Sequence, residues 1–466
     1  MIEATTDPRV VVIGGGISGL AAAHRLSTLG LSVTLVDKSE RLGGKVSTDH
    51  VDGFVIESGP DSFVAGKETV IELATELGIE DQIISTRPEH RGSYVWSRHR
   101  LHPLPEGLLL MTPSRLGPLF RSSLLSRRGR LRAAGDLLVP RRQAEGDESL
   151  ESFVVRRLGR EVLDRIAEPL IAGIHAAEPA SMSLEASFPR FLEMERDHRS
   201  LILAARALSK RASTVTSHFA SFRRGMGELT AALIESLEVT DRKTAVSVIR
   251  LRDGAVNRFS VDLSDGTQIG ADGVVLAVPA RDAVALLRDT SPGAGDAVGG
   301  IRQVSTTAVT LAYRSDQIPV LSGTGFVIPA VEGRRLMGVS YLSRKWEERV
   351  PSEQFVLLRA FLRRGAAEGR LPTEVARAEL ADLIGIRARP ILERTHHWDD
   401  GLHQYTLGHR QRVAKAEQCL QAIPGLAIAG AAFHGIGLNE CIASGRRAAD
   451  QIAASVKGSI RSVMTH

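Results

Sequence analysis

The chain has 466 residues and an apolar content of 43%, and its charges nearly balance, with Lys+Arg 59 against Asp+Glu 54. This length predicts two or three domains. The net charge of +5 gives the whole chain no basic signature of a nucleic-acid-binding protein, so no nucleic-acid partner is expected. Cys419 and Cys441 lie in no CxxC pattern, which argues against a disulfide framework, a thiol redox site and a metal site, and is typical of a reducing compartment.

No apolar run reaches the roughly 18 residues that a membrane-spanning helix needs. The N-terminus shows no cationic segment followed by a long apolar one, which is the pattern of a secretory signal. We therefore expect neither a signal peptide nor a transmembrane segment, and a cytoplasmic location.

Residues 9–37 predict a strand, a glycine turn, a helix and a second strand. Apolar residues 10–13 form the first strand, and the second, residues 32–36, ends on Asp37. The glycines allow a tight turn and let backbone N–H groups at the helix start approach a pyrophosphate, while the acid stands where ribose hydroxyls are bound. The pattern predicts a dinucleotide site. The expected contacts are Gly14, Gly15, Gly16, Ile17, Ser18, Gly19 and Asp37.

The residues that follow Asp37 indicate which dinucleotide is bound. Residues 41–45 read RLGGK, so two adjacent glycines give a second backbone loop, and Arg41 and Lys45 add positive charge near the pyrophosphate. This stretch resembles the second FAD motif of the flavin amine oxidase and protoporphyrinogen oxidase superfamily. The resemblance implies FAD rather than NAD. It adds Lys38, Arg41, Gly44 and Lys45 to the expected cofactor contacts.

Residues 57–63 read ESGPDSF and resemble a segment of bacterial haem-pathway oxidases that lies beside the flavin. The resemblance implies that the backbone of this turn approaches the isoalloxazine ring. An ordinary turn between a strand and the amphipathic helix predicted for residues 70–77 remains the alternative. The expected cofactor contacts here are Gly59, Pro60, Asp61 and Ser62.

Arginine dominates residues 87–142, which hold 12 arginines, no lysine and three acids. Such a stretch suits carboxylate groups of a substrate, an anionic membrane surface or a docking protein, and an exposed charged face is the plain alternative. Residues 101–107, LHPLPEG, resemble the start of the porphyrinogen-binding domain of the same family.

Residues 148–163 predict one helix, and residues 169–175, PLIAGIH, resemble a glycine-containing helix breaker of the haem-pathway oxidases. His175 at its end has two interpretations, a structural role or an approach to substrate. Residues 222–227 predict a turn. It resembles the point in the family at which the chain re-enters the cofactor domain.

Alternating apolar runs separated by Asp-Gly pairs at 253–254 and 265–266 predict hairpins, and residues 274–278 predict a buried strand. The resemblance implies that the backbone of Val246 contacts the adenine side of FAD. Farther along, the patterns predict strands at residues 306–313, 325–329 and 355–361, and helices at 374–384 and 411–422.

Residues 398–409 read WDDGLHQYTLGH and are similar to a family pattern of Trp, then Pro-Gln-Tyr, then Gly-His, with His403 where proline is usual. The closing segment repeats the opening pattern, with a strand at 426–430, glycines in 435–439 and a helix through Val456. The positive end of that helix would face the flavin ring edge and stabilise negative charge there. Its expected contacts are Ile436, Gly437 and Leu438.

The resemblance covers nearly the whole chain, which is identified as a member of the bacterial porphyrinogen oxidases. It implies an α/β fold, with a Rossmann-like FAD-binding domain, an interleaved mixed α+β substrate domain and a helical sub-domain. The expected ranges are 1–86, 216–300 and 423–466 for the FAD-binding domain, 87–215 for the substrate-binding and helical region, and 301–422 for the substrate-binding domain.

The implied reaction is oxidation of coproporphyrinogen III in haem biosynthesis, with non-covalent FAD, O2 as acceptor and H2O2 as product. Protoporphyrinogen IX, which has two carboxylates instead of four, is the alternative substrate. An amine or carotenoid oxidase and a non-catalytic FAD-binding protein stay open, although four tyrosines and three tryptophans offer little for the aromatic cage of an amine site. A ferrochelatase-like partner and peripheral membrane contact are also open, and no catalytic residue is assigned.

Overall fold

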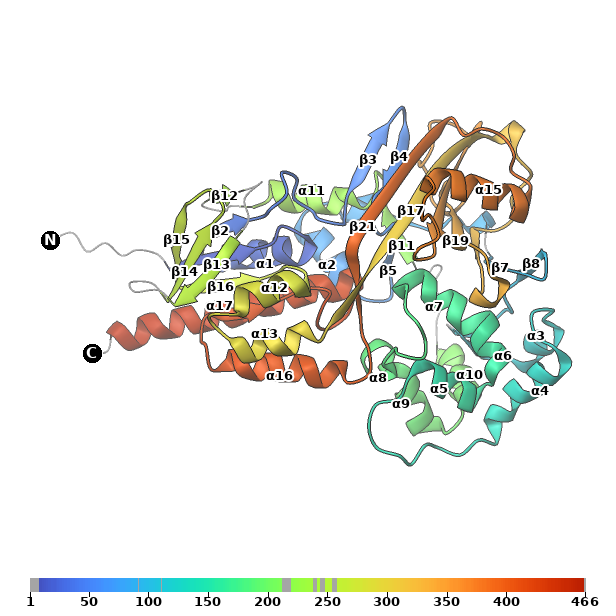
Figure 1. Ribbon diagram of the computed structural model, residues 1–466, viewed down its shortest axis with the longest axis horizontal. Coiled ribbons are helices and arrows are strands. Elements are labelled where there is room, and N and C mark those ends of the chain that lie inside the picture. The colour runs from blue at the N-terminus through green and yellow to red at the C-terminus, as the bar shows by residue number, and fades with distance from the viewer. Residues whose placement is uncertain are drawn as a thin grey trace.

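The computed structural model describes residues 8–90, 92–109, 111–211, 219–237, 241–243, 248–253 and 258–464. The molecule is elongated (Figure 1), with a parallel sheet between helices at one end and a larger sheet beside a helical body at the other. Two long strands, β17 (Arg302–Arg314) and β21 (Leu392–Gln404), run from the larger sheet toward the parallel one.

The parallel sheet contains the predicted dinucleotide-binding pattern. Its strand order is β12-β2-β1-β16-β22, and every neighbouring pair is parallel. The strands are β12 (Asp241–Lys243), β2 (Ser32–Val36), β1 (Arg9–Ile13), β16 (Gly273–Leu276) and β22 (Leu426–Ile428). Val10, Val11 and Val12 have no exposed surface, as expected for a strand covered on both faces.

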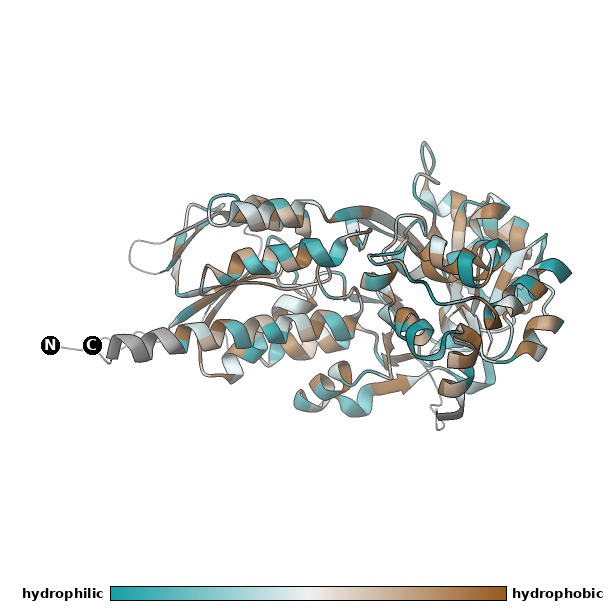
Figure 2. Cartoon of the chain, turned by 90° about the horizontal axis from the view of Figure 1, so that it is seen from below, coloured by the Kyte–Doolittle hydropathy of each residue, from teal (hydrophilic) through white to brown (hydrophobic). Residues whose placement is uncertain are grey.

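Helices cover both faces of this sheet. On one face α1 (Ile17–Thr28), α11 (Gly227–Glu235) and α17 (Leu438–Met464) share a core with Val10 and Val12. On the other, α12 (Ala280–Leu287), α13 (Pro292–Gly299) and α16 (His409–Gln421) pack with Val11 and Ile13. Along α17, the long helix that leads to the C-terminus in Figure 2, apolar and polar residues both recur, as in a helix with one buried face. The α/β fold is confirmed.

Short antiparallel sheets accompany the two main sheets. The hairpin predicted at Asp265 and Gly266 is present between β14 (Phe259–Leu263) and β15 (Gln268–Ala271), and β13 (Val248–Asp253) pairs on the other side of β14. A further hairpin joins β3 (Thr48–Val51) to β4 (Phe54–Glu57), and β5 (Phe63–Val64) pairs with β11 (Phe219–Phe222), which also pairs with β6 (Ile83–Ser85). The helix α2 (Thr69–Glu76) follows β5.

The larger sheet has seven strands in the order β21-β17-β20-β19-β18-β7-β8 and is antiparallel except at β18–β7. Besides β17 and β21, its strands are β20 (Phe355–Leu362), β19 (Leu336–Tyr341), β18 (Gly325–Val327), β7 (Tyr94–Ser97) and β8 (Arg100–Pro103). The helix α15 (Pro372–Ile384) covers one face, and α14 (Leu342–Lys345) follows β19.

The helical body lies between β10 (Thr112–Pro113) and β11 and has its own apolar core. Its helices are α3 (Leu116–Arg121), α4 (Arg127–Ala134), α5 (Leu150–Arg157), α6 (Arg160–Val162), α7 (Glu168–His175), α8 (Leu184–Ser187), α9 (Pro189–His198) and α10 (Leu201–Arg211).

Two expectations from the sequence need correction. The single helix predicted for residues 148–163 is wrong, because Gly159 adopts φ +95° and separates α5 from α6. The apolar spacing continues across the break, so the pattern did not reveal it. The 13-residue strand β21 was not predicted, because its sequence, LERTHHWDDGLHQ, is largely polar. The domain boundaries stay a prediction, and α16, assigned to the substrate domain, packs in the core of the parallel sheet.

Candidate functional site

The two N-terminal glycine loops touch each other at the carboxyl end of β1. Gly43 donates its N–H to the carbonyl of Gly15 at 2.8 Å, and a Cβ on Gly44 would lie 3.2 Å from the Cα of Gly16. Gly14 has φ +106°, and a Cβ there would lie 2.4 Å from the carbonyl oxygen of Ala277. Side chains are therefore excluded where the predicted pyrophosphate loop forms.

The start of α1 keeps its backbone donors available. Gly16 is its N-cap and supplies no capping side chain, and the first turn holds no acid. A Cβ on Gly16 would meet no atom of the described residues within 4 Å, so this side of the loop is open. Free N–H groups at an open, positive helix end fit a phosphate group.

Asp37 is fixed at the end of β2 by two backbone donors. Its carboxylate accepts the N–H of Gly15 at 2.5 Å and the N–H of Ser39 at 2.7 Å. It remains half-buried beside the first glycine loop. This position fits the predicted contact with ribose hydroxyls.

The predicted cations of the second loop point in different directions. Lys38 bonds to Asp282 of α12 at 2.9 Å, and the exposed Arg41 reaches Asp49 at 3.4 Å. Lys45 instead donates its ammonium to the carbonyl of Gly401 in β21. Lys45 thus joins the second glycine loop to the larger sheet, whereas cofactor contacts of Lys38 and Arg41 remain a prediction.

Lys45 has a strongly shielded environment. Burial lowers the pKa of its ammonium, while the thiol of Cys441 raises it. Burial also raises the pKa of that thiol to about 11, with Ser18 and Lys45 acting in the opposite direction. Ser18 of the N-terminal glycine segment and Lys45 of the second loop are therefore both close to Cys441, which lies in α17 of the C-terminal segment.

The segment of Gly59 packs directly on the second loop. A Cβ on Gly59 would lie 1.9 Å from the carbonyl oxygen of Lys45. The carbonyl of Ser58 accepts the indole N–H of Trp398 at 2.9 Å, and Arg359 of β20 donates to the carbonyls of Ser58 and Gly59. The larger sheet therefore fixes the backbone of the turn that was predicted to lie beside the flavin.

Asp61 makes its contacts within the protein. Its carboxylate accepts the ammonium of Lys345 at 2.8 Å and the indole N–H of Trp346 at 3.1 Å, and Ser62 donates to it at 3.0 Å. Burial would raise the pKa of Asp61, but Lys345 and Trp346 hold it well below its usual range. These contacts anchor the turn to α14, and a cofactor contact of Pro60, Asp61 or Ser62 stays a prediction.

The loop after β22 is held by Tyr405. The tyrosine hydroxyl accepts the N–H of Gly435 at 2.6 Å and donates to the carbonyl of Ala431 at 2.9 Å. Its ring stacks on His409, with ring centroids 3.8 Å apart. Tyr405 and His409, which flank the turn that leads into α16, thus position the loop that carries Ile436 and Gly437.

The start of α17, at Leu438, is packed tightly on α1 and α2. Asn439 accepts the N–H of Val70 at 3.1 Å and donates to the carbonyl of Val64 at 3.2 Å. A Cβ on Gly445 would lie 2.1 Å from the carbonyl oxygen of Ser18. The structure therefore brings the N-terminal and C-terminal glycine segments together across α1 and α17.

Residues 401–405, at the end of β21, contact four separate segments around this arrangement. They reach the second glycine loop, the start of α12, the end of α7 and the loop before α17. The contacting pairs are Lys45 with Gly401, Ala280 with His403, His175 with Gln404, and Gly435 with Tyr405. This segment was matched to a family pattern, but its bridging position was not predicted.

Two predicted residues remain to be placed. Val246 lies outside the described residues. His175 ends α7, where its ring meets Phe188 at 5.4 Å and its carbonyl accepts Gln404. Burial lowers the pKa of His175 to about 4, so its ring is neutral at neutral pH, and an approach to substrate stays a prediction.

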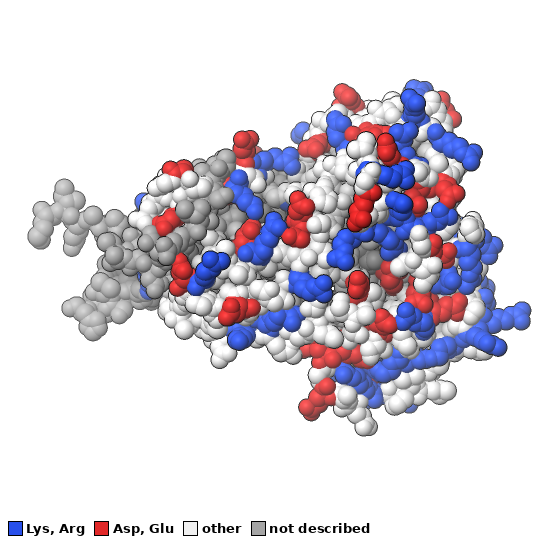
Figure 3. All heavy atoms as spheres, viewed as in Figure 1, with Lys and Arg blue, Asp and Glu red and all other residues white. Residues whose placement is uncertain are grey.

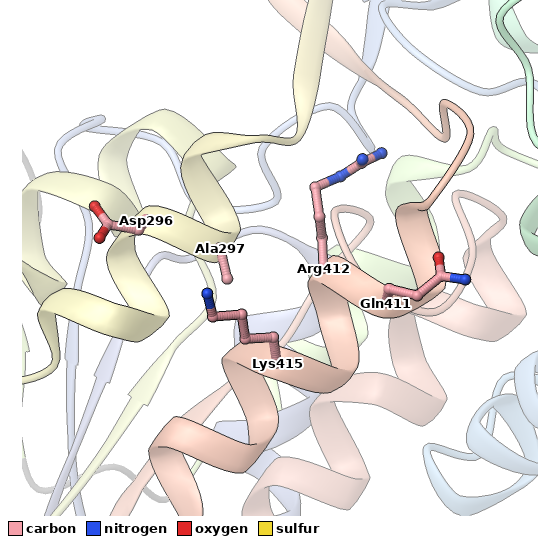
Figure 4. A pocket seen from close by; sticks show the side chains of 5 residues that line it. All are labelled: Asp296, Ala297, Gln411, Arg412 and Lys415. Atoms are coloured by element: carbon pink, nitrogen blue, oxygen red, sulfur yellow. The ribbon is translucent and has the colours of Figure 1, made fainter.

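These residues fit a bound FAD. Two glycine loops leave a space without side chains at the start of α1, and Asp37 lies beside it at the end of β2. The start of α17 is packed nearby on α1. Among the described residues, no cluster of His, Cys, Asp or Glu could hold a metal ion. The cavity of about 310 Å³ between α13 and α16 lies elsewhere. Asp296, Gln411 and Lys415 line it from facing helices (Figure 4).

Comparison with known proteins agrees with this geometry. The model of the family "flavin containing amine oxidoreductase" matches residues 17–453. The chain belongs to this family. It is therefore an FAD-dependent oxidoreductase, and the relationship predicted from its motifs is confirmed.

Similar proteins span nearly the whole chain. A coproporphyrinogen III oxidase of Propionibacterium freudenreichii subsp. freudenreichii is 34% identical over 95% of this chain and 90% of its own. A protoporphyrinogen oxidase of Bos taurus is 32% identical, over 95% and 98%. The crystal structure of a putative protoporphyrinogen oxidase from Exiguobacterium sp. 255-15 superposes with a TM-score of 0.86 at 29% identity, covering 96% of this chain and 99% of that one.

Sequence reasoning missed several residues that build the site. Arg359 lies in an apolar strand pattern, and Tyr405 follows a strand that was not predicted. Glu57 belongs to the ESGPDSF segment, but no role was predicted for it, although it has no exposed surface. A charged residue inside an apolar run was the available signal for Arg359, because a buried charge needs a partner.

Proposed function

We propose that this enzyme oxidises coproporphyrinogen III to coproporphyrin III in haem biosynthesis. Six electrons and six protons leave the substrate, and three molecules of O2 take them up as three of H2O2. Bound FAD would supply the two-electron acceptor for each of the three steps. The name of the P. freudenreichii relative, matched over 95% of this chain and 90% of its own, supports this substrate.

One structural observation carries the proposal. Residues 401–405 extend from the larger sheet onto the glycine loops of the parallel sheet, so the predicted substrate domain meets the predicted FAD site. A substrate held against the larger sheet would therefore face the cofactor. Protein groups here position rather than react: Arg359 orders the Ser58–Gly59 backbone and Tyr405 orders the loop before α17.

The test compares two substrates with the FAD-loaded enzyme. We expect the fluorescence of the porphyrin product to appear faster from coproporphyrinogen III than from protoporphyrinogen IX, with H2O2 released in step. A large preference for protoporphyrinogen IX would favour the second candidate, which the names of the Bos taurus and Exiguobacterium relatives support. Activity with amines and none with either porphyrinogen would contradict both.

The arginine-rich stretch supports a surface role. Arg121, Arg127 and Arg128 are exposed on α3 and α4, far from the glycine loops, and Lys and Arg gather at this end of the molecule (Figure 3). Phe120 and Leu131 are exposed beside them. We propose this face as the docking surface of a ferrochelatase-like partner. Binding to anionic vesicles in a sedimentation assay would instead favour a membrane surface.

The cellular location is also a proposal. No helix in the described part of the chain is long and apolar enough to cross a membrane. We propose a cytoplasmic enzyme, which cell fractionation of the source organism tests directly.

A further inference from the structure

His403 stands in the middle of the bridging segment 401–405. It pairs with Gln303 of β17 in the strand register, and its side chain is 5% exposed. Its Nε2 lies 3.3 Å from the backbone N of Ala280, the first residue of α12.

The contact with Ala280 fixes the tautomer of the ring. A backbone N–H can only donate, so Nε2 accepts and the proton of the neutral imidazole is on Nδ1. Burial, with smaller contributions from Lys45 and His409, lowers the pKa of His403 to about 3, so the ring stays neutral at neutral pH. The Nδ1–H group has no hydrogen-bond partner among the described residues. A buried donor without a partner is costly, and such donors in native proteins are usually matched by a ligand or water.

The surroundings of His403 indicate which ligand is near. Lys45 is one of its electrostatic neighbours and follows Gly44, which packs on Gly16. Ala280 follows the carboxyl end of β16 by a few residues. The carboxyl ends of parallel strands are where such sheets bind nucleotides. His403 is thus at the edge of the sheet that carries the pyrophosphate loop.

We propose that the Nδ1–H of His403 donates a hydrogen bond to an oxygen of the pyrophosphate–ribityl part of bound FAD, which makes it a cofactor-positioning residue. Three observations support this assignment: the fixed tautomer of the ring, the Nδ1–H donor without a partner among the described residues, and the neighbouring glycine loops. It does not depend on which porphyrinogen is oxidised.

A pair of isosteric variants separates the two ring nitrogens. In His403→Asn the amide N–H can take the place of Nδ1, whereas in His403→Gln the amide oxygen can take the place of Nε2 and keep the contact with Ala280. FAD affinity is measured by quenching of flavin fluorescence on the FAD-stripped full-length protein. Melting temperatures are measured with and without FAD.

We expect His403→Gln to weaken FAD binding about tenfold, a loss of roughly 1.4 kcal/mol. Its FAD-free form should melt close to the wild-type temperature, because the contact with Ala280 is kept, and FAD should raise its melting temperature less. His403→Asn should bind FAD within about threefold of wild type.

Three results would overturn the proposal. The first is an unchanged FAD affinity in His403→Gln. The second is a larger loss in His403→Asn than in His403→Gln, which would show that the contact with Ala280 is what matters. The third is a drop in the melting temperature of both FAD-free variants with an undiminished rise on adding FAD, which would assign a structural role.

Discussion

At the scale of single residues, Glu57 is a buried acid that directly precedes the turn at Ser58 and Gly59. Its carboxylate accepts the hydroxyl of Thr48 at 2.7 Å and the N–H of Met226 at 2.8 Å, and it has no exposed surface. Burial raises the pKa of Glu57 to about 7, although Arg349 lowers it. The folded protein therefore holds a proton there between the ordinary pKa of 4.5 and about 7, where the unfolded chain has released it.

This difference predicts a pH-dependent effect on stability. As pH rises through that window, wild type loses stability relative to Glu57→Gln, which cannot titrate, by up to about 3 kcal/mol. Urea unfolding of both proteins at about pH 5 and about pH 8 measures it. Glu235→Gln, at an exposed position, is the control. Parallel stability profiles for wild type and Glu57→Gln would contradict the raised pKa.

Tyr405 offers a second test at this scale. Its hydroxyl satisfies the N–H of Gly435 and the carbonyl of Ala431. Tyr405→Phe leaves both backbone groups without that partner and should cost about 1–3 kcal/mol in unfolding free energy. Hydrogen exchange should become faster in the loop before α17. Tyr94→Phe, in β7 near the opposite edge of the larger sheet, controls for the loss of a hydroxyl, and equal effects of the two changes would contradict the assigned role.

At the scale of elements, the crossing of α1 and α17 holds the two ends of the chain together. The carbonyl of Ser18 leaves no space for a side chain at Gly445. Gly445→Ala should separate the helices, lower the unfolding free energy by about 1–3 kcal/mol and weaken FAD binding. Urea unfolding and fluorescence titration measure the two effects.

Gly117→Ala is the matched control in a helix. A Cβ at Gly117 meets no described atom within 4 Å, and its backbone is not in the left-handed region. This change should be neutral or stabilising by up to about 1 kcal/mol. If Gly445→Ala lowers the unfolding free energy no more than Gly117→Ala does, the close crossing of α1 and α17 does not contribute to stability.

The sequence predicted those elements whose patterns are local. The order strand, glycine turn, helix, strand and acid within residues 9–37 is present in β1, α1, β2 and Asp37, because each step is encoded in adjacent residues. The closing glycine turn and helix were predicted for the same reason.

The strand β21 shows where this reasoning stops. It is stabilised by pairing with β17, about 90 residues earlier, through a register that shifts between Val304 and Thr306. Because it contains polar residues such as His396 and Asp399, its sequence lacks the alternation of apolar and polar residues that marks a strand with one buried face. The contacts of residues 401–405 depend on that pairing, so the centre of the site was not predictable from local sequence.

At the scale of the whole molecule, two bodies are joined by crossing strands rather than by a single linker. β17 and β21 extend from the larger sheet to the parallel one, and Lys45, Arg359 and Trp398 tie the sheets together at the predicted flavin-side turn. FAD bound between these parts should couple their stabilities. We therefore expect saturating FAD to raise the melting temperature of the full chain in a single cooperative transition, and two separate transitions, one of them insensitive to FAD, would contradict it.

The central claim is that four segments distant in sequence surround one FAD. Hydrogen–deuterium exchange of the full-length protein, with and without FAD, tests it most directly. The account predicts slower exchange on FAD binding in residues 14–19, 41–45, 401–405 and 430–440 together. Protection confined to residues 14–45, with the β21 end and the C-terminal loop unchanged, would contradict it.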